Sequence, residues 1–304
     1  MIDFVDRGSC ASPVHSRKES SNVKKGTFSN IILILMLLLG LSLLLYPTFA
    51  DYWNSLHQTR AIATYAEEVA VLDDDKYIEL WEDAIAYNKT LSEKENQYYV
   101  DDESLPIYES LLNITGSGIM GSIEIPSIGC SLPIYHGVDE SVLQVAVGHL
   151  EWTSLPTGGE STHCVMSGHR GLPSARLFTD LDQLQPGDTF MLHILDETLT
   201  YEVDQILIVL PHETDALLIE EGKDLCTLVT CTPYGVNSHR LLVRGHRVEN
   251  EAQAVIHRVT ADALQVEPIA IAVVLFFPIL ILLLILSSIL EKLFRSSRNN
   301  TSER

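Results

Sequence analysis

One of the five cysteines, Cys231, has neighbours that suit nucleophilic chemistry. The run 227–231 reads TLVTC, a β-branched and apolar pattern that predicts a strand ending at the cysteine, and the loop sequence TPYG follows at 232–235. Strand ends that open into loops are common positions for catalytic side chains on a rigid scaffold. A thiol attacks as the thiolate, so Cys231 needs a base and a cationic or hydrogen-bonding group close by.

His169 and Arg240 are the candidates for those two groups. His169 ends another predicted strand, within the Gly-flanked turn SGHRG at 167–171, and an imidazole there can act as general acid and base. Arg240 opens the strand that follows the Cys231 loop, so a hairpin would return it beside the thiol. Spacing alone leaves open the alternative of a buried core cysteine and a surface histidine, because these residue types occur together in most proteins.

The elements that must position these side chains are strands. Seven runs from Ile119 onward have strand patterns, namely 119–126, 131–137, 163–169, 188–195, 199–210, 224–231 and 240–248. The Asp196-Glu197 link between two of them suggests a hairpin. So many short strands, with few helical patterns between them, predict a mainly β protein with a closed or sandwich fold.

The segment before the strands is predicted to be helical and then irregular. Apolar residues recur at helical spacing from Trp53 to about Leu91, and the acidic run 73–75 suits the start of a helix. We interpret this run as solvated, with calcium binding as the alternative. Residues 92–110 are polar and acidic without periodicity, which predicts a loop.

Two apolar blocks flank this central region. Residues 31–45 and 269–290 carry no charge, and the 22 residues of the second block suffice to cross a bilayer core, which needs about 20. The first block, extended to 31–50, is predicted to be an uncleaved transmembrane anchor, with a cleaved signal peptide as the alternative. The blocks explain how a chain with a net charge of −21 has a mean hydropathy of +0.14.

Charge determines the predicted topology. Residues 51–268 hold 36 acidic and 11 basic residues, whereas the flanks 1–30 and 291–304 are each net +2. Because basic residues favour the cytoplasmic side, both termini are predicted to be cytoplasmic and the middle of the chain to lie outside the cell membrane. The strong acidity argues against nucleic-acid binding, which requires a basic surface.

The remaining cysteines fit a disulfide scaffold poorly. Cys226 and Cys231 lie five apart in one predicted strand and project to opposite faces, so they cannot pair with each other. A Cys130–Cys164 bridge is left open, although Cys164 and Cys226 are interpreted as small core residues. Zinc binding near the strand end lacks the close paired spacing of structural sites, so neither a metal nor a cofactor is predicted.

The strings around the three candidate side chains resemble the active-site signature of the sortases. TLVTC at 227–231 is similar to the strand that carries the nucleophile in that family, and NSHRLLVRG at 237–245 is similar to the next strand with its arginine. SGHR at 167–170 is similar to the family's histidine motif. The resemblance extends over about residues 110–248, through the strings GSIEIP, LPIYHG and TSLPTGGE.

The resemblance implies a sortase-type closed β-barrel with short helices at 116–248. A helical segment with a lid-like loop, 51–115, precedes the barrel, and a linker, 249–268, leads to the second membrane helix. An N-terminal hydrophobic segment together with a C-terminal anchor is similar to class C, the pilus-assembling sortases, whereas single-anchor sortases lack the second helix. Basic tails at 1–30 and 291–304 complete the expected organisation.

By the same resemblance, Cys231 is the nucleophile that attacks the carbonyl between Thr and Gly of an LPxTG-type sorting motif and forms a thioester. His169 protonates the departing amine and later deprotonates the incoming one, and Arg240 stabilises the oxyanion. The implied acceptor is a lysine amine of a pilin subunit, and no cofactor is implied. The expected protein is a membrane-anchored cysteine transpeptidase, grouped with the peptidase-type hydrolases.

Two departures from the family pattern bear on this expectation. Class C enzymes often carry an Asp-Pro-aromatic lid tripeptide, and residues 86–115 contain none. LPTGG at 155–159 looks like a sorting motif but does not precede a hydrophobic stretch and basic tail, so we interpret the chain as enzyme and not substrate. One alternative is a catalytically inactive sortase-like scaffold. Another is a hydrolytic cysteine protease, because sequence does not show whether an amine or water resolves the thioester.

Overall fold

The computed structural model describes residues 20–94, 96–99 and 103–250. Eight strands form a closed barrel in the order β1-β2-β3-β4-β7-β8-β6-β5. Their bounds are β1 Ile119–Ile125, β2 Cys130–His136, β3 Val147–His149, β4 Thr162–Ser167, β5 Thr189–Ile194, β6 Glu197–Val209, β7 Asp224–Thr232 and β8 His239–Val248. The β2–β3 and β4–β7 pairs are parallel, whereas β7–β8 and β6–β8 are antiparallel.

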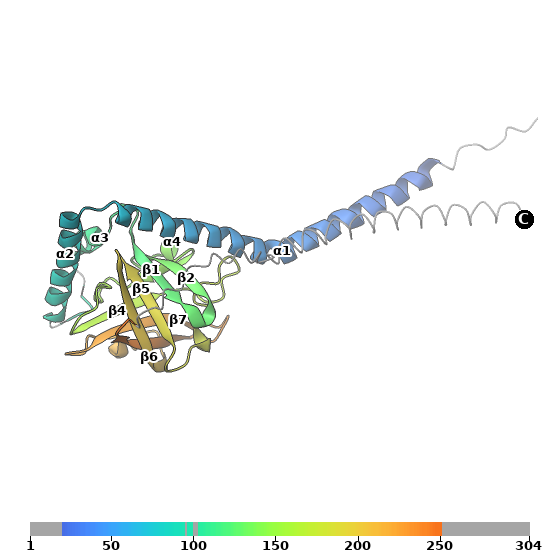
Figure 1. Ribbon diagram of the computed structural model, residues 1–304. Coiled ribbons are helices and arrows are strands. Elements are labelled where there is room, and N and C mark those ends of the chain that lie inside the picture. The colour runs from blue at the N-terminus through green and yellow to red at the C-terminus, as the bar shows by residue number, and fades with distance from the viewer. Residues whose placement is uncertain (1–19, 95, 100–102, 251–304) are drawn as a thin grey trace, which may run out of the picture. The chain divides into compact units, whose positions relative to one another are not determined.

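Helices and short 3-10 turns complete the described part of the chain (Figure 1). Their bounds are α1 Ser20–Ala70, α2 Asp74–Ser92, α3 Ser104–Ser110, α4 Glu140–Leu143, η1 Pro126–Ile128, η2 Leu181–Gln183 and η3 Asp215–Leu217. The barrel interior is filled by alternate strand residues: in β6, Leu199, Tyr201 and Val203 are buried while the residues between them are partly exposed. Strand β7 is buried along nearly its whole length, because an apolar cluster also covers its outer face.

Helix α1 belongs to two units, one up to Pro47 and one from Thr48 onward. The helix begins at Ser20, before the predicted apolar block, and continues to Ala70. Among the described residues, Ile32–Ala70 is the helical stretch that contains a window long and apolar enough to cross a membrane. The helix therefore contains the first predicted apolar block and the start of the predicted helical segment.

The second half of α1 packs on the barrel. The hydroxyl of Tyr65 donates to the carbonyl of Met120 at 2.9 Å and accepts the N–H of Leu195 at 2.8 Å. Nearer the middle of the helix, the amide of Asn54 donates to the carbonyl of Ser174 at 2.9 Å. These bonds join α1 to β1, to the β5–β6 turn and to the loop after β4.

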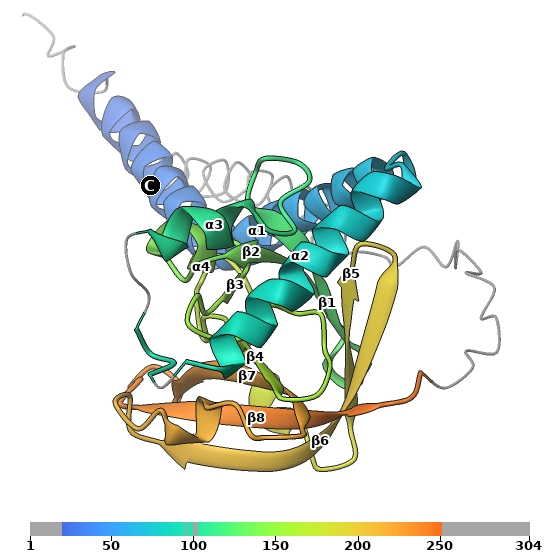
Figure 2. The same cartoon turned by 90° about the vertical axis from the view of Figure 1, so that its left-hand side faces the viewer.

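Helices α2 and α3 lie across one end of the barrel (Figure 2). Helix α2 begins as predicted, because the carboxylate of Asp73 accepts the N–H of Lys76 at 2.8 Å and caps its first turn. The prediction of a loop throughout 92–110 is wrong, since α3 lies within it. A seven-residue helix shows no periodicity, and α3 is held by Tyr108, which is fully buried in the core.

The predicted closed β-fold is confirmed, and all seven predicted strands are present within two residues at their ends. Strand β3 is missed by the sequence because three residues are too few for a pattern. The predicted hairpin joins β5 and β6 through Leu195 and Asp196, one residue earlier than expected. The predicted second membrane helix at 269–290, most of the linker and the C-terminal tail lie outside the described residues.

Candidate active site

Cys231 and Arg240 face each other across neighbouring strands. Strands β7 and β8 are antiparallel, and their register pairs Cys231 directly with Arg240. Directly opposite residues of an antiparallel pair project to the same face, with Cβ atoms about 5 Å apart. Both side chains are partly exposed, although most of β7 is buried. The hairpin predicted to return Arg240 beside the thiol is therefore present.

The guanidinium of Arg240 is held at the start of β8. Its Nη1 donates to the carbonyl of His239 at 3.1 Å and to that of Asn237 at 3.3 Å. These acceptors are neutral backbone groups of the loop after Cys231, so they orient the guanidinium and leave its positive charge intact. A fixed cation beside a thiol can bind an oxygen on which negative charge develops.

His169 lies on the other side of β7. Strand β4 runs parallel to β7, and the contact continues past its end. The N–H of Gly168 donates to the carbonyl of Val229 at 3.0 Å, and the hydroxyl of Thr230 donates to the carbonyl of Gly168 at 2.8 Å. His169 directly follows Gly168, and Cys231 directly follows Thr230. The sheet order β4-β7-β8 thus sets the cysteine between the histidine and the arginine.

The turn that carries His169 is fixed by close packing. A Cβ atom at Gly168 would lie 2.7 Å from the ring of Phe178, so only glycine lets that ring approach. Phe178 is fully buried in the barrel core, and its N–H donates to the carbonyl of His169 at 3.1 Å. The imidazole therefore extends from a backbone that is anchored to the core on one side and to β7 on the other.

His169 also has a carboxylate neighbour. Its Nε2 lies 3.6 Å from Oε2 of Glu140, the first residue of α4, and the two side chains are 27% and 72% exposed. The hydrogen bond from Gln144, and then the charge of His169, hold the pKa of Glu140 below its ordinary value. Sequence reasoning misses Glu140, because a four-residue helix gives no pattern. The available signal was its place shortly after the LPIYHG string.

Arg170, which follows His169, ties the histidine turn to the cysteine loop. Its side chain is 9% exposed and donates to the hydroxyl of Thr232 at 3.3 Å and to the carboxylate of Asp182. Its guanidinium carbon lies 5.9 Å from the ring centroid of Tyr234. The residue after the histidine is thus bonded to the residue after the cysteine, which fixes the distance between the two strand ends.

The other described cysteines are poorly suited to act as nucleophiles. Burial, together with the charge of Asp180, raises the pKa of Cys130 to about 12, and burial raises the pKa of Cys164 well above its ordinary value. All four described cysteines are free thiols, so the Cys130–Cys164 bridge is not formed. Cys164 and Cys226 lie side by side in the core, as predicted. Cys231 is the remaining described thiol, and it lies at a partly exposed strand end.

His149 and His136 have structural roles. His149 is fully buried, with Nδ1 2.9 Å from the hydroxyl of Tyr108 and Nε2 2.8 Å from the carbonyl of Ser154. Burial lowers the pKa of His149 to about 3 and also lowers that of His136. Within residues 20–94, 96–99 and 103–250, no group of three or more His, Cys, Asp and Glu side chains is arranged to hold a metal ion.

A buried apolar cluster lies on the outer face of the barrel beside Cys231. Cys231 shares this face with Val229, two residues earlier in β7. Val229 packs in a cluster with Val165, Leu217 and Leu242. Partly buried residues extend the cluster, namely Leu150, Trp152, Leu207, Val209 and Ala216. Because Val209 pairs with Arg240 across β6 and β8, this cluster extends to the arginine side of the thiol.

Residues 96–99 of the predicted lid-like loop lie against the connection between β6 and β7. The side-chain oxygen of Gln97 accepts the N–H of Ile219 at 3.0 Å. The ring of Tyr98 lies 5.0 Å from that of Trp152, and its hydroxyl lies 3.5 Å from a carboxylate oxygen of Asp215. This segment therefore covers the connection that also supplies Leu217 to the apolar cluster.

The sorting-motif-like string LPTGG at 155–159 is structural. The N–H of Leu155 donates to the side-chain oxygen of Asn88 at 2.7 Å, and the amide nitrogen of Asn88 donates to the carbonyl of Leu155 and the hydroxyl of Thr157 at 2.9 Å. Residues 155–157 are buried. The string thus attaches α2 to the barrel and is not available as a substrate.

Comparison with known proteins identifies the family to which this barrel is similar. Residues 123–248 match the family model described as the sortase domain. The solved sortase C1 of Streptococcus agalactiae is 52% identical, and the match covers 63% of this chain and 100% of that one with a TM-score of 0.62. The solved sortase C of Clostridium perfringens with the C-terminal cell wall sorting motif is 44% identical, covers 63% and 100%, and has a TM-score of 0.56.

Curated sequences agree over a shorter stretch. Sortase D of Bacillus subtilis (strain 168) is 32% identical over 131 residues, which is 42% of this chain. The match spans 63% of that relative's length and 62% of the length of sortase A from Bacillus anthracis, so it covers less than two thirds of either. In contrast, the match covers 97–100% of the chain in four solved sortase C structures, which come from Streptococcus agalactiae, Streptococcus pneumoniae and Clostridium perfringens. The chain belongs to the sortase family, and class C is the group to which its solved structural neighbours assign it.

Proposed function

We propose that this sortase is a transpeptidase that joins pilin subunits and that Cys231, His169 and Arg240 are its catalytic residues. The observation that carries the proposal is the order of the three residues across β4, β7 and β8, with the cysteine directly opposite the arginine. The Clostridium perfringens relative that was solved with the C-terminal cell wall sorting motif supports a peptide of that kind as the first substrate.

In the first half-reaction, the Cys231 thiolate attacks the carbonyl carbon between Thr and Gly of an LPxTG-type motif. Arg240 donates to the oxyanion of the tetrahedral intermediate. The carbon–nitrogen bond then breaks while the His169 imidazolium gives its proton to the leaving glycine amine. The part of the motif that ends in Thr remains on Cys231 as a thioester, and the part that begins with Gly leaves as a free amine.

In the second half-reaction, a lysine amine of another pilin subunit replaces the thiolate. Neutral His169 takes a proton from the incoming amine, the amine nitrogen attacks the thioester carbon, and the sulfur leaves as the thiolate. The product is an isopeptide bond between subunits. Water in place of the amine would release the peptide, which is the hydrolase reaction of a cysteine peptidase.

We infer that the barrel is held at the outer face of the cell membrane. The apolar window within Ile32–Ala70 supports one anchor. The apolar block at 269–290 and the basic tails support a second anchor and cytoplasmic termini by sequence. An anchored barrel meets precursors as they emerge from the membrane.

The test uses the full chain in detergent micelles with an LPxTG peptide and a lysine-bearing pilin domain. Mass spectrometry should detect an acyl adduct on Cys231 and then an isopeptide-linked product. Cys231→Ala should abolish both the adduct and the product. Its unfolding temperature should equal that of the unmodified chain, which shows that the variant is folded. The mechanism would be overturned if the unmodified chain formed no acyl adduct. It would also be overturned if Cys231→Ala formed as much adduct as the unmodified chain. An adduct that yields only hydrolysed peptide would favour the protease.

A further inference from the structure

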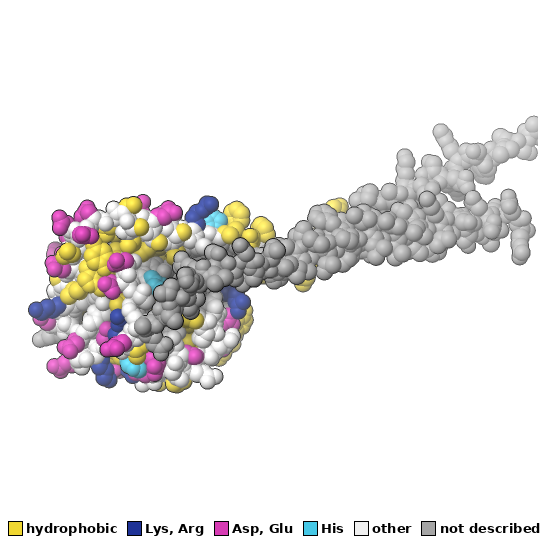
Figure 3. Space-filling view, in the orientation of Figure 1, with side chains coloured by type: hydrophobic (Ala, Val, Ile, Leu, Met, Phe, Trp, Pro, Cys, Tyr) yellow, Lys and Arg dark blue, Asp and Glu magenta, His cyan; other side chains and the backbone are white. Residues whose placement is uncertain are grey.

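The second half-reaction needs a binding group that the three catalytic residues do not supply. A lysine amine has an ordinary pKa of about 10.4, so it arrives as an ammonium and must lose a proton before it attacks. The group that holds it must therefore be negatively charged and must lie beside the base. Acidic side chains are spread over the face of the domain in Figure 3, so general acidity does not identify that group.

Glu140 has the position that such a group requires. Its Oε2 lies 3.6 Å from Nε2 of His169, and its side chain is 72% exposed. Its other carboxylate oxygen, Oε1, accepts a hydrogen bond from the amide of Gln144 one helical turn later. One oxygen thus fixes the orientation of the carboxylate, and the other is presented to solvent next to the imidazole.

The sheet order separates Glu140 from the oxyanion side of the site. Helix α4 packs against β3, and β4, β7 and β8 follow β3 in that order around the barrel. Along this direction the site reads Glu140, His169, Cys231 and Arg240. The cation for the developing oxyanion therefore lies on one side of the thiol. The anion for an ammonium lies on the other side, beyond the base.

We propose that Glu140 binds the lysine ammonium of the acceptor and holds it against His169. This assignment rests on the proposed function and names the acceptor site of the same reaction. The ammonium pairs with Oε2 and gives one proton to water. As the amine nitrogen then attacks the thioester carbon, the nitrogen gives a second proton to the neutral imidazole. When the sulfur leaves as thiolate, His169 carries the proton, and Glu140 stays ionised throughout.

The experiment compares Glu140→Gln with the unmodified full chain in detergent micelles, with the LPxTG peptide at saturation and the lysine acceptor titrated. The substitution keeps size and hydrogen bonding at an exposed position, so the chain should fold. The KM for the lysine acceptor should rise about fivefold, as expected when an exposed ion pair is lost. The loss should be confined to the acceptor step, with the Cys231 thioester forming at its normal rate.

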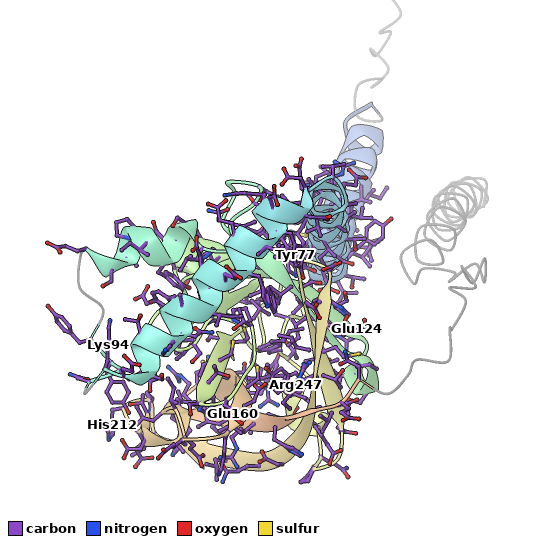
Figure 4. All side chains as sticks on the ribbon, turned by 60° about the vertical axis from the view of Figure 1, so that its left-hand side comes forward. Tyr77, Lys94, Glu124, Glu160, His212 and Arg247 are labelled. Atoms are coloured by element: carbon purple, nitrogen blue, oxygen red, sulfur yellow. The ribbon has the colours of Figure 1, made fainter. Side chains whose placement is uncertain are left out.

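A neutral nucleophile separates charge recognition from other effects. Hydroxylamine is uncharged at neutral pH and resolves thioesters, so Glu140→Gln should leave its rate unchanged while the lysine rate falls. Glu124→Gln is the matched control, because Glu124 forms a similar exposed pair with His193 at 3.4 Å on the barrel wall (Figure 4). This variant should behave as the unmodified chain with both nucleophiles.

Three results would overturn the assignment. An unchanged KM for lysine excludes Glu140 as the acceptor site. Equal losses with lysine and hydroxylamine, or a slower thioester step, assign Glu140 to orienting His169 instead. If the unmodified chain forms no Cys231 thioester, the proposed function fails and the acceptor site fails with it. If the thioester forms normally and the acceptor KM is unaltered in Glu140→Gln, the acceptor site is rejected and the proposed function stands.

Discussion

Cys231 is the penultimate residue of β7, and it pairs directly across the strands with Arg240, the second residue of β8. The geometry of the antiparallel ladder, and not a flexible loop, sets the separation of sulfur and guanidinium. Neutral carbonyls hold the guanidinium in place. The arginine is therefore an oriented donor before any substrate binds, which is the condition for strong stabilisation of an oxyanion.

Replacing Arg240 with alanine should slow thioester formation by about 10²- to 10³-fold, the usual cost of losing an oxyanion donor. Arg240→Lys should recover only part of this rate, because an ammonium lacks the planar fork. Single-turnover mass spectrometry of the Cys231 adduct measures both. The unfolding temperature should not change, since Arg240 is partly exposed and bonds only to backbone carbonyls. A rate within threefold of the unmodified chain for Arg240→Ala would reject the role.

Alkylation should distinguish Cys231 from the other described thiols. In a Cys10→Ser background at pH 8, iodoacetamide should modify Cys231 first, because burial keeps Cys130 and Cys164 protonated. Peptide mapping over time gives the order of labelling. Unfolding the chain in guanidinium should remove the difference. Labelling of Cys130 as fast as Cys231 in the folded protein would contradict the assignment of Cys231 as the reactive thiol.

The link between Arg170 and Thr232 should position the two reacting groups. Arg170→Lys keeps the charge but cannot bond Thr232 and Asp182 together through one planar fork. We expect the rate constant for thioester formation to fall about tenfold while the KM for the sorting peptide stays constant. Thr232→Val, which removes one of these bonds, should show a smaller fall. A change in KM alone would show that Arg170 acts on substrate binding and not on the geometry of the thiol and the imidazole.

Much of the barrel could be predicted from sequence because its strands are long and patterned. β6, for example, alternates between buried and partly exposed residues over its first half and is apolar at 206–209. Strand β3 and helices α3 and α4 could not be predicted, since three to seven residues carry no period. What holds these short elements is tertiary contact, such as the buried ring of Tyr108 in α3.

The residues of the candidate site differ in the same way, since some lie on patterned strands and others are held by tertiary contacts. Cys231, His169 and Arg240 lie at the ends of patterned strands, so their neighbourhood follows from strand order and register. Glu140, in the short helix α4, and Arg170, in the loop after β4, lie near the site through contacts between segments far apart in the sequence. The distance of Glu140 to His169 depends on how α4 packs against β3, and no local pattern encodes that packing.

The attachment of α1 to the barrel should depend on the hydroxyl of Tyr65. Tyr65→Phe leaves the carbonyl of Met120 without its donor and the N–H of Leu195 without its acceptor, and both groups are buried. Losing the hydroxyl should cost about 1–3 kcal/mol of unfolding free energy. Thermal unfolding in detergent measures the change. Thr59→Val is a suitable control, because its hydroxyl bonds only within the helix, to the carbonyl of Ser55. Equal stability of both variants would contradict the role of Tyr65.

Acid should destabilise the folded barrel through His149. Burial lowers its pKa to about 3 in the folded protein, against the ordinary 6.5 in the unfolded chain. Between these values the unfolded chain binds a proton that the folded chain does not, so stability is complete above about pH 6.5 and decreases as the pH falls. One such group contributes about 1.4 kcal/mol per pH unit in that range.

The unfolding free energy should therefore fall steeply between pH 6.5 and pH 5, and His149→Gln should reduce the slope by about one proton. Part of the slope should remain, because burial also lowers the pKa of His136 and of His163. Denaturant titrations at several pH values measure it. A full slope in His149→Gln would show that His149 is not the buried neutral group that acid must charge for the barrel to unfold.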